Sequence, residues 1–405
     1  ISMTQYKLNL IAFLLSLSGL EFLITGFGSI SVAFVVLNLT SFYLLVCYRV
    51  IIPSYINFIL ACIVLTMIST GIYNFIFIDN FSPLSHFKIV FKVFAVMFMA
   101  ITYPTILSKI SYIQLFAALI FVLRFHILLI FLDAVFYSPI DWGDAGVILN
   151  ERDVDYDRPR GVFGEPSRFA IFQSILLATI LFLDYRFKEI KLKSYDFFLG
   201  VASIMVSTSL FGAVVSVILL TQYLFYKLSQ SSSLTRTRTV NAFTIFSLIT
   251  IAVIFFIFFG TQFEYIQSRF MNVIAFSDGS TRARIIGGYL SFIDVLQNQP
   301  FSGYGGGNFN QQINIDESLV IEKYSTVAGN VVLNNTTFLS AISIASGIIP
   351  VLFLFSIFIF TLIKRYYFYS LIMFSTTIGS GLYYYPAFWI SLVIFCYYVK
   401  GKKLH

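Results

Sequence analysis

The chain has 405 residues, of which 58% are hydrophobic and only 11% are charged, and its net charge is +7. A soluble domain carries about 25% charged residues, so the composition excludes an ordinary soluble enzyme and predicts an all-α polytopic membrane protein. The basic residues are spread through short loops, which argues against nucleic acid as a partner. The 3 cysteines lie in apolar runs and the 3 histidines lie far apart, so we expect no disulfide framework, no metal site and no cofactor.

Apolar runs of about 20 residues, the length needed to cross a bilayer, recur along the chain. We interpret residues 1–405 as a single transmembrane domain of about twelve spans. The run at 195–228 is interrupted by STSLFG (207–212), so it forms either two short spans or one long tilted helix; we take the interruption as a break. The expected spans are 8–25, 28–48, 55–78, 86–107, 111–136, 166–184, 195–208, 210–228, 240–260, 336–362, 366–381 and 384–399.

The distribution of charge predicts the orientation of these spans. On one face, alternate short loops hold about 15 of the 26 Lys and Arg, and such loops are normally cytoplasmic. Both termini fall on this face. The opposite face carries two large segments, 137–165 and 261–335, with about 13 of the 19 acidic residues. External segments of this size are where the chemistry of a membrane protein is expected.

The stretch RGVFGEPSRF (160–169) closes the first external segment and opens a span. Pro166 suits the first helical turn and Glu165 stands at its cap. The positive end of the helix dipole then faces outward, which favours an anion. Arg168 adds a charge on the first turn, and Arg160 can fold back over the same point. The alternative is that Glu165 only caps the helix while both arginines snorkel or pair with acidic loop residues.

The second external segment contains an amphipathic helix, expected at about 281–297. Arg282 falls within its apolar stripe, the expected buried face, and therefore needs an anionic partner, either a ligand or a structural carboxylate. Arg284 falls on the opposite side. The glycines that follow, in PFSGYGGGNF (300–309), match no phosphate-binding loop and indicate a tight turn. The residues that share the apolar stripe are Ile285, Ile286, Tyr289, Leu290, Ile293 and Leu296.

Several further polar residues lie within or beside the spans. Lys88 and Lys92 are four residues apart near the outer end of the fourth span, so they share a helix face. Arg124 and Asp133 in the fifth span point to opposite sides and do not pair with each other. Charges inside a membrane suggest function, and the cations could line a cavity for a lipid-linked phosphate. Two asparagines, Asn334 and Asn335, lie at the mouth of the 336–362 run, where they bind substrate or cap the helix.

The order of these motifs over about 250 residues resembles bacterial O-antigen polymerases of the Wzy type, which are related to O-antigen ligases. RGVFGEPS opens a span, a short span ends near STS (207–209), NQPFSGYGGGNF (298–309) follows Arg282 and Arg284, and NNTTFLS (334–340) re-enters the membrane. This chain has Leu210 where relatives often have arginine, so no role is assigned there. Asn334 stands where the ligases have histidine, which favours the polymerase.

The resemblance implies a fold like that of the GT-C integral-membrane glycosyltransferases and a location in the bacterial inner membrane, with the active site facing the periplasm. The implied substrates are two undecaprenyl-pyrophosphate-linked oligosaccharides of lipopolysaccharide biosynthesis, and a chain-length regulator and a flippase are implied partners. A hydroxyl of one repeat unit would attack the anomeric carbon of the growing chain, and undecaprenyl pyrophosphate would leave.

These substrates give the candidate residues their expected roles. Arg160, Arg168 and Arg282, with Lys92, would stabilise the pyrophosphate without a metal. Glu165 is the first candidate for a general base, ahead of Asp133 and Asp141. Arg284, Tyr289, Asn334 and Asn335 would contact the substrate, and Tyr289 and Tyr304 could stack on sugars.

Two other functions remain open. An O-antigen ligase would transfer the glycan to lipid A core. A flippase or another carrier of lipid-linked oligosaccharides would account for twelve spans and intramembrane cations, although a carrier needs no external segments of this size.

Overall fold

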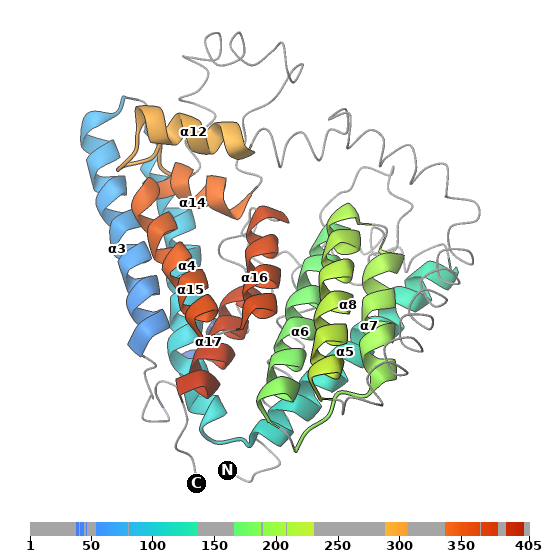
Figure 1. The fold of residues 1–405 in the computed structure, drawn as a ribbon. Helices are drawn as coiled ribbons and strands as arrows, with labels where there is room; N and C mark the ends of the chain where they lie inside the picture. Colours follow the sequence, from blue (N-terminus) through green and yellow to red (C-terminus); the bar gives the residue numbers. More distant parts are fainter. Residues whose placement is uncertain are drawn as a thin grey trace, which may run out of the picture. The chain divides into compact units, whose positions relative to one another are not determined.

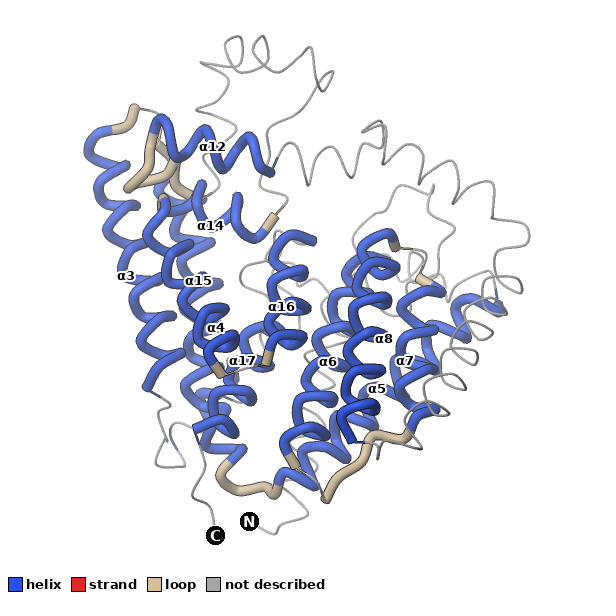
Figure 2. The backbone as a smooth tube through the Cα atoms, viewed as in Figure 1, coloured by secondary structure: helices blue, strands red, loops and turns tan. Residues whose placement is uncertain are grey.

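The computed structural model of the chain describes residues 54–79, 81–136, 166–187, 189–207, 209–230, 288–306, 337–364, 366–379 and 386–400, with six positions between 38 and 46. Within these ranges the chain forms helices joined by short turns, and it forms no strand (Figure 2). The all-α prediction is therefore confirmed for the described residues. The helices are α3 (Ser54–Phe77), α4 (Pro83–Leu107), α5 (Tyr112–Phe136), α6 (Pro166–Arg186), α7 (Ser194–Val206), α8 (Leu210–Gln230), α12 (Gly288–Asn298), α14 (Phe338–Ser346), α15 (Ile348–Ile363), α16 (Tyr367–Gly379) and α17 (Pro386–Lys400).

Four helices of the described residues are long and apolar enough to cross a membrane, as expected of a membrane protein. Large apolar side chains remain exposed along them, for example Phe77 on α3 and Leu128 on α5, as suits contact with lipid tails. Two predicted spans, 8–25 and 240–260, and most of 28–48 lie outside the described residues, so the number twelve stays a prediction. The four helical segments are Phe58–Phe77, Pro83–Leu107, Tyr112–Val135 and Ser167–Arg186, and shorter apolar helices cover Ser194–Val206, Phe211–Tyr226, Ile348–Ile363 and Ala387–Val399.

Hydroxyl groups on these apolar helices bond to the backbone of their own helix. Thr66 Oγ1 donates to the Cys62 carbonyl at 2.7 Å, and Ser69 Oγ donates to the Leu65 carbonyl at 2.9 Å. Thr179 on α6 does the same toward Ile175. Such bonds to the preceding turn satisfy a polar side chain where water is scarce. The helices therefore carry Ser and Thr without losing their apolar character.

The described helices belong to two compact units. The first, which we call the α6 unit, contains α5 to α8 and α17. In it α6 packs against α5, α7 and α8, and α6 is buried along nearly its whole length. Helix α17 joins the same unit through the hydroxyls of Ser391 and Thr179, 2.6 Å apart, and through the rings of Phe182 and Phe395.

The run at 195–228 forms two helices rather than one. Helix α7 ends at Val206, α8 begins at Leu210, and the two pack against each other (Figure 1). The hydroxyl of Ser209 accepts the backbone N–H of Gly212 at 3.4 Å, which caps the start of α8. The predicted break is thus confirmed. With 13 residues, α7 is about 20 Å long and falls short of a bilayer core of about 30 Å.

The second unit, which we call the α14 unit, contains α3, most of α4, α12, α14, α15 and α16. Helix α14 packs against α3, α12, α15 and α16, and its helix start is closed by a capping box between Thr337 and Ser340. The prediction of a single helix through 336–362 was wrong. Gly347 ends α14 with φ 76° and ψ −163°, a conformation available essentially only to glycine, so α15 starts in a new direction.

Candidate functional site

Only three of the nine predicted site residues lie in described parts of the chain. Arg168 belongs to the α6 unit, whereas Lys92 and Tyr289 belong to the α14 unit. Each unit is described by itself, so the proposed grouping of cations around one pyrophosphate stays a prediction. The other six residues, with Asp141, lie outside the described residues: Arg160, Glu165, Arg282, Arg284, Asn334 and Asn335.

Arg168 lies in the predicted position at the start of a helix. Helix α6 begins at Pro166, and Arg168 is partly exposed in its first turn, which contains no acidic residue. The residues that follow, from Phe169 onward, are buried. The guanidinium therefore stands at the point where a buried helix begins, which is the placement that an anion site at this helix end requires.

Lys92 lies on α4, one turn beyond Lys88. The side chain of Lys88 is exposed and that of Lys92 is partly buried. Ile89 precedes Lys92 by three residues and therefore lies on a neighbouring part of the same helix face. Ile89 is also the side chain that a Cβ on Gly306 would meet, at 2.7 Å. Lys92 thus lies near the glycine-containing turn that follows α12.

That turn, Pro300–Gly306, is here called the glycine turn. It is built into the junction between α14 and α15. The backbone N–H groups of Tyr304 and Gly305 both donate to the Ile344 carbonyl, at 2.8 and 3.0 Å, and the N–H of Ile348 donates to the Pro300 carbonyl at 2.8 Å. Gly303 and Gly305 have φ of 58° and 84°, which confirms that the glycines permit a tight turn.

The N–H groups of the glycine turn are used inside the protein. The N–H of Gly303 donates to the Gln299 carbonyl at 2.9 Å, and the N–H of Gly306 donates to Nδ1 of His86 at 2.8 Å. Together with Tyr304 and Gly305, four successive N–H groups therefore have protein acceptors. In the described structure the turn connects α12 to the α14–α15 junction through these hydrogen bonds. A phosphate-binding loop needs free N–H groups, and these four amides do not supply them.

His86 connects this turn to α3. Its side chain is fully buried on α4, and its Nε2 lies 2.8 Å from the carbonyl of Met67. A carbonyl only accepts, so Nε2 carries the proton, while Nδ1 accepts from Gly306. These two bonds fix one neutral tautomer. On α3, Gly71 leaves room for the ring, because a Cβ there would lie 2.5 Å from two of its atoms.

We expect His86→Phe to lower the free energy of unfolding by about 2 kcal/mol, because it leaves the buried N–H of Gly306 without its acceptor. Gly71→Ala should act in the same direction by displacing the ring. Unfolding in mixed detergent micelles, followed by far-UV circular dichroism, measures both. The exposed neighbour Lys88 provides the control, Lys88→Gln, which should change stability by less than about 0.5 kcal/mol. Equal stability of His86→Phe and the parent would show that the two bonds contribute nothing net.

Tyr289 is 63% exposed on α12, and the expected burial of the apolar stripe holds only in part. Leu290 of the stripe is buried, but Tyr289 and Leu296 are exposed, whereas Ser291 and Asp294, outside the stripe, are buried. Asp294 is nevertheless satisfied, since it accepts from Tyr304 Oη at 2.6 Å and from Asn298 Nδ2 at 2.8 Å. Tyr304, predicted to stack on sugars, thus bonds to α12.

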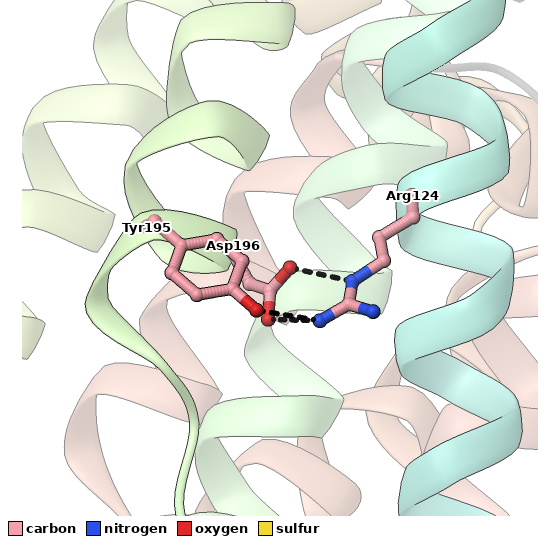
Figure 3. Close-up of polar contacts among 3 residues, drawn as sticks. All are labelled: Arg124, Tyr195 and Asp196. Atoms are coloured by element: carbon pink, nitrogen blue, oxygen red, sulfur yellow. Dashed lines mark hydrogen bonds and ion pairs between the residues drawn. The ribbon is translucent and has the colours of Figure 1, made fainter.

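An ion pair in the α6 unit was missed by the sequence analysis. Arg124 on α5 forms two bonds to Asp196 on α7, from Nε to Oδ1 at 2.7 Å and from Nη2 to Oδ2 at 2.9 Å, and Nη2 also donates to Tyr195 Oη at 3.0 Å (Figure 3). The prediction that Arg124 does not pair with Asp133 holds. Arg124 was also expected to help line a cavity for a lipid-linked phosphate; in the described structure its charge is matched by Asp196. The signal was an acidic residue in the first turn of an apolar helix.

Within the described residues, no three His, Cys, Asp or Glu side chains are grouped as metal ligands would be. No protein-family model matches the chain, and no curated protein or solved structure is significantly similar to it. The class that the described residues define is an all-helical protein with helices long and apolar enough to cross a membrane. Any narrower assignment depends on the motifs themselves.

Proposed function

We propose that the chain is a membrane glycosyltransferase of the O-antigen polymerase type, acting on undecaprenyl-pyrophosphate-linked repeat units at the periplasmic face of the inner membrane. The observation that carries the proposal is the stretch RGVFGEPSRF, because two arginines and a carboxylate lie within nine residues of sequence next to the start of a span. The described start of α6 at Pro166, with Arg168 in its first turn, supports this. The break between α7 and α8 and the glycine turn match the order of motifs expected for such an enzyme.

The proposed reaction needs little from the protein beyond charge stabilisation and one proton acceptor. The hydroxyl oxygen of the incoming repeat unit forms the new bond to the anomeric carbon. The bond from that carbon to the phosphate oxygen breaks, and the electron pair leaves with the pyrophosphate. Arg160, Arg168 and Arg282, with Lys92, stabilise the developing negative charge. Glu165 accepts the hydroxyl proton.

The remaining candidates bind the oligosaccharides. Arg284 and the amides of Asn334 and Asn335 are donors for sugar hydroxyls or phosphate oxygens. The exposed ring of Tyr289 offers an apolar face on which a sugar could stack. Both substrates remain attached to membrane lipid, so binding through several weak contacts suffices to hold them near the reacting centre.

The test is a polymerisation assay with the purified full chain in nanodiscs, supplied with undecaprenyl-pyrophosphate-linked repeat units and EDTA. We expect a ladder of products on a gel. Removal of one arginine proposed to stabilise the pyrophosphate, in Arg160→Ala, Arg168→Ala or Arg282→Ala, should lower the polymerisation rate about 100-fold or more. Glu165→Gln should lower it by a factor of about 100 to 10,000 if this carboxylate is the base.

The exposed Lys191 on the loop before α7 provides a matched control, since Lys191→Ala removes a cation from a loop assigned to the cytoplasmic face. It should retain the parent rate. Absence of a ladder from folded protein and cognate repeat unit would overturn the polymerase. Transfer of glycan to lipid A core would indicate a ligase, and movement of lipid-linked oligosaccharide across liposomes without a new glycosidic bond would indicate a carrier.

A further inference from the structure

The exposed side of α12 is apolar, although two polar residues, Ser291 and Asp294, are buried on its other side together with Leu290 and Val295. Tyr289 is 63% and Leu296 is 38% exposed. Phe292 and Ile293 are partly exposed on the same side. A surface helix in water turns its polar side outward. The apolar character of the exposed side therefore indicates that the outer side of α12 faces something other than water.

The orientation of α12 about its own axis is fixed by close contacts on its buried side. Gly288 lies against Thr337 at the start of α14, where a Cβ on the glycine would approach Thr337 Cγ2 to 2.7 Å. Further along the helix, Asp294 accepts a hydrogen bond from Tyr304 Oη of the glycine turn at 2.6 Å. Rolling the helix to bury Tyr289 and Leu296 would break these contacts. The apolar side is therefore held outward by the fold.

Helix α12 lies over α14, at the level of the end of α3, a helix long and apolar enough to cross a membrane (Figure 1). The link is direct within this unit, because Asn74 near the end of α3 donates to the Gly303 carbonyl of the glycine turn at 3.3 Å. Exposed apolar side chains continue there, with Ile76 and Phe77 on α3 and Phe301 just after α12, the last of them 70% exposed. A helix at the end of a membrane-crossing helix lies where the bilayer surface is.

We propose that α12 is an interfacial helix whose face formed by Tyr289, Phe292, Ile293 and Leu296 inserts into the phospholipid surface at the end of α3. An exposed helix face of apolar and aromatic residues is typical of helices that lie in a membrane interface, and tyrosine is enriched at this depth. The lipid would remove the exposed apolar area from water. The proposal concerns this unit alone and does not depend on the glycosyltransferase assignment; it gives the Tyr289 ring to lipid in place of the sugar proposed above.

The test compares three variants of the full chain, each with one added tryptophan. Tyr289→Trp and Leu296→Trp place the probe on the apolar face, and Gln297→Trp places it on the exposed polar neighbour. Each variant is reconstituted in nanodiscs of phosphatidylcholine and phosphatidylglycerol, with or without lipid brominated near the headgroup end of its acyl chains. The natural Trp142 and Trp389 are common to all samples and are subtracted with the parent.

We expect brominated lipid to quench the added tryptophan at positions 289 and 296 about twofold or more strongly than at 297, and aqueous acrylamide to show the opposite order. Equal quenching of all three by acrylamide, without an effect of bromine, would overturn the proposal by placing α12 in water. Protection from both quenchers would also overturn it, since another protein segment would then cover the face. Equal quenching of all three by lipid would exclude a one-sided contact. All three substitutions replace exposed residues, so the variants should fold.

Discussion

Gly347→Ala is expected to lower the free energy of unfolding by about 4 kcal/mol, the largest single effect that the described structure predicts. Two costs combine at this residue. Its φ of 76° and ψ of −163° lie in a region essentially restricted to glycine. A Cβ would also lie 2.6 Å from the carbonyl carbon of Phe301 and the carbonyl oxygen of Pro300. These are backbone atoms, so neither can rotate away.

Gly200→Ala is the matched control for that substitution. Gly200 is equally buried, but it lies inside α7 with the chain in ordinary helical conformation, and a Cβ there would meet only side-chain atoms of Leu177 and Leu123, at 3.0 to 3.3 Å. The gain of about 1 kcal/mol in helix propensity offsets this crowding, so we expect a change within about 1 kcal/mol. Unfolding of both variants in mixed micelles gives the comparison. Similar losses for the two would show that the α14–α15 junction tolerates a side chain.

The long apolar helices could be predicted from the sequence almost to the residue. The expected spans 55–78, 86–107 and 111–136 correspond to α3, α4 and α5, each within a few residues at both ends. A span in lipid satisfies its backbone only as a helix, so a long apolar run leaves one structural choice. Pro166 fixed the start of α6 in the same way, because its ring favours the first helical turn.

Predictions that depended on which side of a helix meets protein were less successful. For α12 the apolar stripe was expected to be the buried face, as it is in a surface helix of a globular protein. Hydrophobicity shows only which side avoids water, and beside a membrane that side can face lipid. The break at Gly347 was missed for a related reason, since the apolar run continues through it. The partnership of Arg124 and Asp196 depends on how α5 packs against α7, which no spacing within one helix reveals.

The glycine turn links the structure to the proposed activity. It joins α12 to the α14–α15 junction, and through His86 and Asn74 it is tied to α4 and α3. Arg282, proposed to stabilise the pyrophosphate, and Arg284, proposed to bind substrate, lie six and four residues before the start of α12 in the sequence. If α12 lies in the lipid surface, the chain on its N-terminal side starts at the depth where a lipid-linked pyrophosphate is found. The hydrogen bonds of the glycine turn then hold α12 at that depth.

The ion pair between Arg124 and Asp196 should show a strongly unequal response to loss of its two members. The Arg124 side chain is 51% exposed, whereas Asp196 is 3% exposed. Arg124→Met leaves a buried carboxylate without its counter-charge, which we expect to cost about 3 kcal/mol of unfolding free energy. Asp196→Asn leaves a half-exposed guanidinium that retains Tyr195 and can reach other anions, so its cost should be nearer 1 kcal/mol.

The double variant separates this pair from simple loss of packing. If Asp196 is destabilising only because Arg124 has gone, then adding Asp196→Asn to Arg124→Met should restore about 1 to 2 kcal/mol. The nearby Lys193, whose ammonium lies 5.6 Å from the centre of the Tyr195 ring, gives a matched control: Lys193→Met should change stability by less than about 1 kcal/mol. Strictly additive losses in the double variant would mean that the two charges are not coupled. A larger loss from Asp196→Asn than from Arg124→Met would mean that the buried carboxylate is not the member that needs its partner.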